Sequence, residues 1–189
     1  MIQHSSDSPQ GPLPLNPPLV PLTAMARIDA LLEEFTREAR TARRHLERLP
    51  EEHFSWRPHA KSFTAGELAG HMAECVRWAE QVFAADELDV DPASYECVRP
   101  GSVASALEAF DAAVDGARLA MEGTADRDAS QPWRMSMRGA VMFEKRREAA
   151  FRDMSLSHLI HHRGQLTVYL RLLDVPLAGT YGPTADDRG

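Results

Sequence analysis

The sequence predicts an all-α protein built as a four-helix bundle. Four long stretches of the 189-residue chain carry apolar side chains at intervals of three and four residues, the spacing of an amphipathic helix. Prolines and glycines separate these stretches, as expected for loops between helices. No segment alternates apolar and polar residues clearly enough to predict a strand. A chain of this length can bury a substantial core as one domain.

The N-terminal residues differ in composition from the rest of the chain. Residues 1–22 hold six of the 13 prolines and show neither helical nor strand periodicity. We therefore expect a disordered, proline-rich tail over residues 1–22 and a helical domain over residues 23–189. Met25 stands where the helical pattern begins, which leaves two interpretations of the upstream segment, an over-extended start or a dispensable arm.

The first two helices have clear boundaries in the sequence. The first is expected from Met25 to Leu49, because Pro50 cannot continue it. A loop follows, with three aromatic side chains as anchors against the core, Phe54, Trp56 and Phe63. Thr64 and Glu67 then have the spacing of a capping box, which predicts the start of the second helix. The apolar face of that helix also contains a histidine, His71.

The second half of the chain is less uniform. An acidic loop around residues 86–96 precedes a third helix, expected from Val103 to Met121 and ended by Gly123. Residues 124–143 contain Pro132 and Gly139, and their pattern leaves a loop, a short hairpin or a helical turn open. The last helix is expected over residues 145–173.

Charge and hydropathy exclude several classes of function. The net charge is -7 and the 21 lysines and arginines form no dense basic tract among 28 acids, so a nucleic-acid partner is not expected. No apolar run reaches the 18 or so residues of a membrane span, and the N-terminus lacks the order of a secretory signal. We expect a cytoplasmic protein with Cys75 and Cys97 as free thiols.

The stretch SHLIHHRGQLTVYLRLL, residues 157–173, places histidines in a leucine-rich helix. Residues four apart share a helix face, so His158 and His162 can converge on one point, whereas His161 points elsewhere. Neutral imidazoles bind zinc, nickel, copper and iron, and a third histidine from a facing helix would leave one coordination position open. His71 is the candidate for this third ligand. The same polar strip continues with Gln165.

Other interpretations of the histidines remain open at this stage. They fit a set of core histidines hydrogen-bonded to carboxylates or to the backbone. His161 would compete for the metal if the helix register were distorted, and Cys75 is either a further ligand or a small buried hydrophobe. The spacing resembles the H-E-x-x-H helix of zinc proteases, but Leu159 and Ile160 occupy the intervening positions and the glutamate base is missing, which argues against protease chemistry.

Two longer motifs resemble a known family. Two stretches are similar to the DinB/YfiT-like family of proposed metalloenzymes. The first is LERLPEEHFSWRPHAKSFTAGELAGHMAE, with its Trp-Arg-Pro loop, and the second is HLIHHRGQLTVYLRLLDVPLAGTYGPTADD. The resemblance covers nearly everything from Met25 to Asp187. It implies an up-down-down-up order of the four helices, a homodimer, and a site for a divalent metal ion. The family's three histidine ligands fall on His71, His158 and His162.

The resemblance also implies a class of chemistry. Zinc or nickel are the first candidates for the metal, and iron or manganese are further ones. Some family members are transferases or isomerases that use a low-molecular-weight thiol in place of glutathione. We therefore expect transfer of such a thiol to a small electrophilic substrate, with metal-assisted hydrolysis as the second version. Gln165 and Tyr169 are the candidate catalytic residues. The alternative is a non-catalytic, metal-binding stress-response bundle that acts through a partner.

Overall fold

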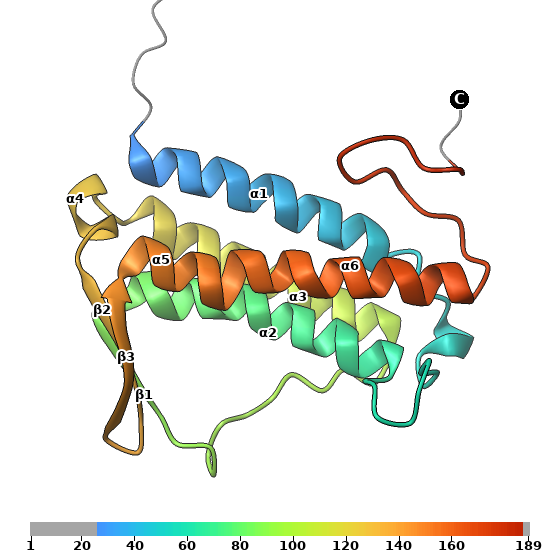
Figure 1. Ribbon diagram of the computed structural model, residues 1–189, viewed down its shortest axis with the longest axis horizontal. Coiled ribbons are helices and arrows are strands. Elements are labelled where there is room, and N and C mark those ends of the chain that lie inside the picture. The colour runs from blue at the N-terminus through green and yellow to red at the C-terminus, as the bar shows by residue number, and fades with distance from the viewer. Residues whose placement is uncertain (1–25, 187–189) are drawn as a thin grey trace, which may run out of the picture.

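The computed structural model describes residues 26–186, so the proposed tail, residues 1–22, lies outside the described residues. Within that range four long helices lie side by side (Figure 1), and they are α1 (Arg27–Leu46), α2 (Ala65–Ala84), α3 (Val103–Glu122) and α6 (Ser157–Leu172). All four had been predicted. The first ends three residues earlier than its predicted end at Leu49. No helix in the described range is long and apolar enough to cross a membrane.

Contacts between loops and helix ends fix the relative directions of the helices. Glu51, before α2, accepts a hydrogen bond from the first N–H of α3, that of Val103, at 2.9 Å, so α2 and α3 start at the same end of the bundle. Asp126, after α3, accepts the N–H of Ile28 at 2.8 Å, so α1 starts where α3 ends. Figure 1 shows α6 running beside α1 in the same direction.

The core lies between the four long helices. Every one of them contributes large side chains that are less than 2 % exposed or close to it, among them Phe35, Leu46, Leu68, Met72, Phe110, Met121, Leu159 and Leu166. Burying each such side chain contributes about 1.5 to 3 kcal/mol. The stripe predicted for α2 is confirmed, because its seven apolar members from Leu68 to Phe83 are all buried.

The start of α2 is fixed by the predicted capping box. The Thr64 hydroxyl accepts the Glu67 N–H at 3.1 Å, and the Glu67 carboxylate accepts the Thr64 N–H at 2.6 Å. Carbonyls of the preceding loop take the next two N–H groups, that of Ala65 at 2.8 Å and that of Gly66 at 2.8 Å. The first N–H groups of a helix have no partner within the helix itself. Because those of α2 are bonded to the loop and to the capping residues, the first turn of α2 has a defined position beside the loop.

A small sheet corrects the purely helical prediction. Strands β1 (Glu87–Val90), β2 (Pro132–Met137) and β3 (Ala140–Arg146) form it in the order β1-β2-β3, with β1 parallel to β2 and β2 antiparallel to β3. Part of the predicted acidic loop is thus a strand. Residues 124–143 form both the hairpin and a helical turn, α4 (Asp126–Ala129). Arg138 and Gly139 adopt positive φ angles, 49° and 77°, as a two-residue hairpin loop requires.

The last helix also begins differently from its prediction. Lys145 and Arg146 belong to β3, and the helical part starts with α5 (Arg147–Phe151). It continues through a π-helical turn, Arg152–Leu156, into α6. Such turns inside α-helices occur frequently at functional sites. This one ends immediately before the segment that carries His158.

Candidate metal centre

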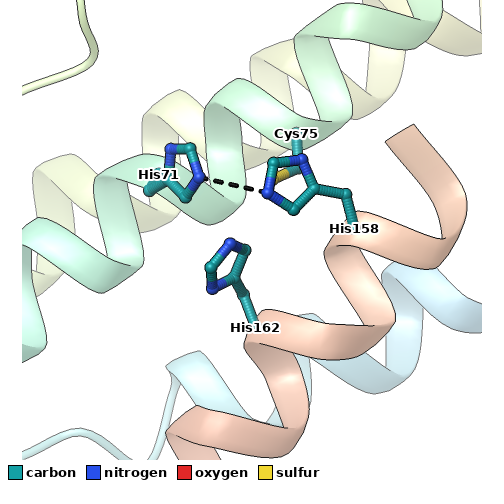
Figure 2. A group of neighbouring side chains, drawn as sticks. All are labelled: His71, Cys75, His158 and His162. Atoms are coloured by element: carbon teal, nitrogen blue, oxygen red, sulfur yellow. Dashed lines mark hydrogen bonds between the residues drawn. The ribbon is translucent and has the colours of Figure 1, made fainter. Parts of the chain in front are cut away.

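Four side chains from two facing helices form one cluster (Figure 2). His71 and Cys75 come from α2, and His158 and His162 come from α6. One potential ligand atom from each of the four lies within 4.8 Å of all the others, and the group could hold a metal ion. The structure therefore brings together the three histidines singled out in the sequence. His161 is exposed and stays outside the group, with its ring 4.9 Å from that of His162.

Hydrogen bonds orient two of the imidazole rings. Nδ1 of His71 lies 2.9 Å from a carboxylate oxygen of Glu74, and Nδ1 of His162 lies 2.8 Å from the side-chain oxygen of Gln165. Both partners are acceptors, so each Nδ1 carries the proton and donates it. The Nε2 atoms of both rings are left with a free lone pair, which is the form that binds a metal.

The third ring, that of His158, faces His71 directly. His158 forms a hydrogen bond with the backbone of Met154, which lies in the π-helical turn. Nε2 of His158 lies 3.4 Å from Nε2 of His71. We infer that Nδ1 of His158 makes the bond to Met154, because its Nε2 faces His71. Two lone pairs then face each other, and only a shared proton or a metal ion between them makes the arrangement favourable. The π-helical turn ends before His158, so the four-residue spacing to His162 remains α-helical.

Burial disfavours protonation of the cluster. It lowers the pKa of His162 to about 4 and also lowers the pKa of His158, with the neighbouring histidines acting in the same direction. Both rings are therefore neutral near pH 7, the form needed for ligation. Burial raises the pKa of the Cys75 thiol to about 12, and the charge of Glu74 adds to this effect. Without a metal ion, Cys75 is a protonated thiol.

The cluster has a closed side and an open side. Cys75 is fully buried and lies behind the His158 ring in Figure 2. The His71 side chain is 26 % exposed and lines a cavity of about 640 Å³. Phe63, expected as a core anchor, is instead 46 % exposed, and its ring lies 5.5 Å from that of His71 at this cavity. A small molecule can approach the cluster from the His71 side.

The two candidate catalytic residues have different surroundings. Gln165 contacts a histidine of the cluster, as described above. Tyr169 packs its ring 5.6 Å from that of Trp56, and its hydroxyl donates a hydrogen bond to the carbonyl of Phe63 at 3.1 Å. It thereby holds the loop that places Phe63 beside His71. Sequence reasoning missed Glu74, although a carboxylate three residues after a histidine on one helix is a signal for such a pair.

Comparisons with known proteins agree with these observations. The sequence model of the DinB family matches residues 23–188. The chain belongs to the DinB family. The solved structure of a DinB-like protein from Bacillus cereus is similar with a TM-score of 0.66 and 18 % identity, covering 83 % of this chain and all of that one. A DinB-like protein from Bacillus subtilis has a TM-score of 0.60 and 18 % identity, covering 85 % and 99 %. No curated protein matches the sequence.

The H-R-G-Q motif, by which the chain resembled the DinB family, has a further role beside the cluster. Arg163 is buried and forms an ion pair with Glu38 of α1, at 2.5 Å, with both side chains 3 % exposed. The hydroxyl of Tyr181, in the C-terminal segment, accepts from Arg163 at 2.6 Å and donates to Glu38 at 2.8 Å. These bonds tie α6 to α1 at the residue next to His162.

Proposed function

We propose that this DinB-family chain is an enzyme that depends on one divalent metal ion, bound by His71, His158 and His162. The observation that supports the proposal is the arrangement of the three imidazoles. The Nδ1 atoms of His71 and His162 are hydrogen-bonded, and one ring nitrogen of each histidine belongs to a single group of potential ligand atoms. Neutral imidazoles suit zinc or nickel first and iron as a further candidate. Manganese is kept as a candidate because of the family resemblance. A divalent ion there would supply a Lewis acid that lowers the pKa of a bound thiol or water.

The favoured reaction is transfer of a low-molecular-weight thiol to a small electrophilic substrate, and metal-assisted hydrolysis is the second version. The positions of the acids support this preference. Glu74 lines the cavity, but its two oxygens already accept hydrogen bonds from His71 and from the N–H of Val98, the latter at 2.7 Å. The other carboxylate of the described lining, that of Glu67, accepts the Thr64 N–H through one oxygen and lies 3.6 Å from Arg57, so both acids already have structural partners. A thiol needs little help, because its ordinary pKa is near 8.5.

The chain's own residues supply orientation and a dry surrounding. Glu74 and Gln165 hold the rings of His71 and His162 in the tautomer that leaves Nε2 free. Apolar side chains at the cavity, such as that of Phe63, limit the number of water molecules that compete with the substrate. Gln165 is thus proposed as an orienting residue, and Tyr169 as a residue that positions the cavity wall.

A second candidate function follows from Cys75. Its sulfur lies within the same group of potential ligands, and a thiolate in the fourth position would close a tetrahedral site. A closed site would suit a non-catalytic, metal-binding stress-response bundle that acts through a partner. The opening of the cluster toward the cavity favours the enzyme.

Three further features are proposed. The end contacts between the helices support the up-down-down-up order of the bundle. The homodimer rests on the family resemblance, and a light-scattering mass equal to one chain at micromolar concentration would contradict it. A cytoplasmic location rests on the low cysteine count.

A thiol-transfer assay tests the enzyme proposal. A panel of small thiols is mixed with a chromogenic electrophile, and three samples are compared: metal-loaded wild type, metal-depleted wild type, and the variant His158→Ala. The uncatalysed addition is subtracted. Of these three samples, only the metal-loaded wild type should show turnover, and metal-loaded His161→Ala, assayed as a control, should be active. Equal rates in all samples, with bound metal shown by elemental analysis, would exclude thiol transfer.

A further inference from the structure

The cavity beside the cluster is built from three segments of the chain. The first turns of α2 form its floor, the loop before α2 contributes Phe54 and Phe63, and the segment before α3 contributes residues 97–100. At about 640 Å³ it has the size of a site for a small organic molecule. Most of its lining is apolar, and the two phenylalanine rings offer flat surfaces to an aromatic or otherwise apolar group.

Two glycines of α2 allow both walls to approach the floor closely. A Cβ atom on Gly66 would lie 2.3 Å from the ring of Phe54, and one on Gly70 would lie 2.4 Å from the carbonyl oxygen of Val98. One turn further along α2, the carboxylate of Glu74 accepts a hydrogen bond from the N–H of the same residue, Val98. The wall that carries Arg99 is thus fixed to the helix that carries His71.

The charged groups of the cavity decide which polar group a ligand can carry. Glu67 is held in the capping box and lies 3.6 Å from Arg57, and both oxygens of Glu74 are occupied as described above. Arg99 lines the cavity and is exposed, and within residues 26–186 its guanidinium forms neither a hydrogen bond nor an ion pair. Its charge acts on Glu67 only from a distance.

The first turn of α2 offers no competing site for an anion. Its leading N–H groups are bonded to the side chain of Thr64 and to carbonyls of the preceding loop. A negative group in the cavity would therefore be recognised by Arg99, while a second negative group would meet the carboxylates of Glu67 and Glu74. The lining thus favours a single negative charge.

We propose that this cavity binds a small monocarboxylate with an apolar, preferably aromatic, body, and that Arg99 is the residue that recognises the carboxylate. This inference deepens the proposed function and rests on it, because it names the class of substrate that lies against His71. The apolar body lies between Phe54 and Phe63, and the carboxylate pairs with the guanidinium at the rim.

Binding of a simple probe tests the proposal without any turnover. The probe is 3-phenylpropanoate, and its neutral isostere is 3-phenylpropanamide. Dissociation constants are measured by ligand-observed NMR titration on the zinc-loaded full chain. We expect the acid to bind about tenfold more tightly than the amide, since a charge-assisted hydrogen bond is lost in the amide. Arg99→Gln should abolish this preference. Arg57→Gln removes an equal charge nearby and should preserve it.

A carboxylate can also bind a metal ion, so two further samples separate the two sites. In His158→Ala, and in zinc-free wild type, the preference for the acid should persist, because Arg99 is intact. A preference that survives Arg99→Gln but vanishes in these two samples would place the carboxylate at the metal and overturn the proposal. Equal binding of acid and amide by the wild type would also overturn it. An Arg99-dependent preference without any thiol transfer would contradict the proposed reaction alone.

Discussion

The Nε2 atoms of His71 and His158 lie 3.4 Å apart across the interface between α2 and α6. A core designed only for packing would not place two imidazole lone pairs face to face, because each would lack a donor. A positive ion between them removes the conflict. Burial lowers the pKa of His158 and so disfavours a proton at this position.

The first prediction concerns metal stoichiometry. We expect about one divalent ion per chain in protein purified without an affinity tag, measured by elemental analysis. His162→Ala should lose most of it, because its Nε2 is one of the converging atoms. His161→Ala is the matched control, since this neighbouring ring lies outside the group and is exposed. Full stoichiometry in His162→Ala would remove this residue from the site.

The second prediction concerns Glu74. A carboxylate can accept from His71 and from Val98 at once, whereas an amide presents a donor on one side. Glu74→Gln should therefore weaken metal affinity about 10- to 100-fold, measured by competition with a chromophoric chelator. Glu80→Gln, on the same helix, should leave the affinity unchanged. Similar affinities in both variants would show that Glu74 only fixes the wall of the cavity.

The third prediction separates an open site from a closed one. We expect cobalt-substituted protein, prepared without added thiol, to lack a thiolate-to-metal charge-transfer band. The reason is that three imidazoles supply the ligands of an open site, which keeps its fourth position for water or substrate. Cys75→Ala should bind metal with nearly unchanged stoichiometry. A charge-transfer band that disappears in Cys75→Ala, but not in Cys97→Ala, would identify a four-ligand site and favour the non-catalytic alternative.

The fourth prediction concerns the buried ion pair of Glu38 and Arg163. Removing one partner leaves an uncompensated buried charge, so Glu38→Gln should lower the free energy of unfolding by about 3 to 5 kcal/mol. The exposed pair of Arg118 and Glu122 is the comparison, and Glu122→Gln should cost less than about 1 kcal/mol. Urea unfolding curves measure both. Equal losses would mean that water reaches the buried pair.

The fifth prediction concerns pH. Burial lowers the pKa of His45 to about 4, with the charges of Arg163, Arg44 and Arg48 acting in the same direction. Between about pH 6.5 and pH 4 the unfolded chain binds a proton at His45 that the folded chain does not, so stability falls as the pH falls. The loss is at most about 1.4 kcal/mol per pH unit.

A matched variant isolates this contribution from that of the carboxylates. Nε2 of His45 lies 3.1 Å from the hydroxyl of Thr180, a contact that the amide of His45→Gln can replace without titrating. Urea unfolding between pH 7.5 and pH 4.5 should show a steeper loss for the wild type than for His45→Gln. Parallel curves would show that His45 does not control the acid sensitivity.

Helical periodicity and spacing predicted much of this protein. The apolar stripe of α2, the capping box at Thr64 and the convergence of His158 with His162 follow from rules that act within one helix, where residues three and four apart are neighbours. The choice of His71 as the third histidine also came from its place on an apolar stripe. In each case the deciding interactions are local, so the sequence alone contains the information.

The tertiary structure decided what depends on contacts between distant segments. The strand β1 was missed because ELDV is short and acidic, and it becomes a strand only by pairing with β2, some 45 residues later. The π-helical turn before His158, the bond from Glu74 to the Val98 wall and the approach of that wall to Gly70 are likewise invisible in local patterns. The sequence by itself determined which residues can form a metal site. Only the packing of α2 against α6 and of the two loops against α2 determined how the rings are oriented and on which side the site is open, because both depend on contacts that no single helix contains.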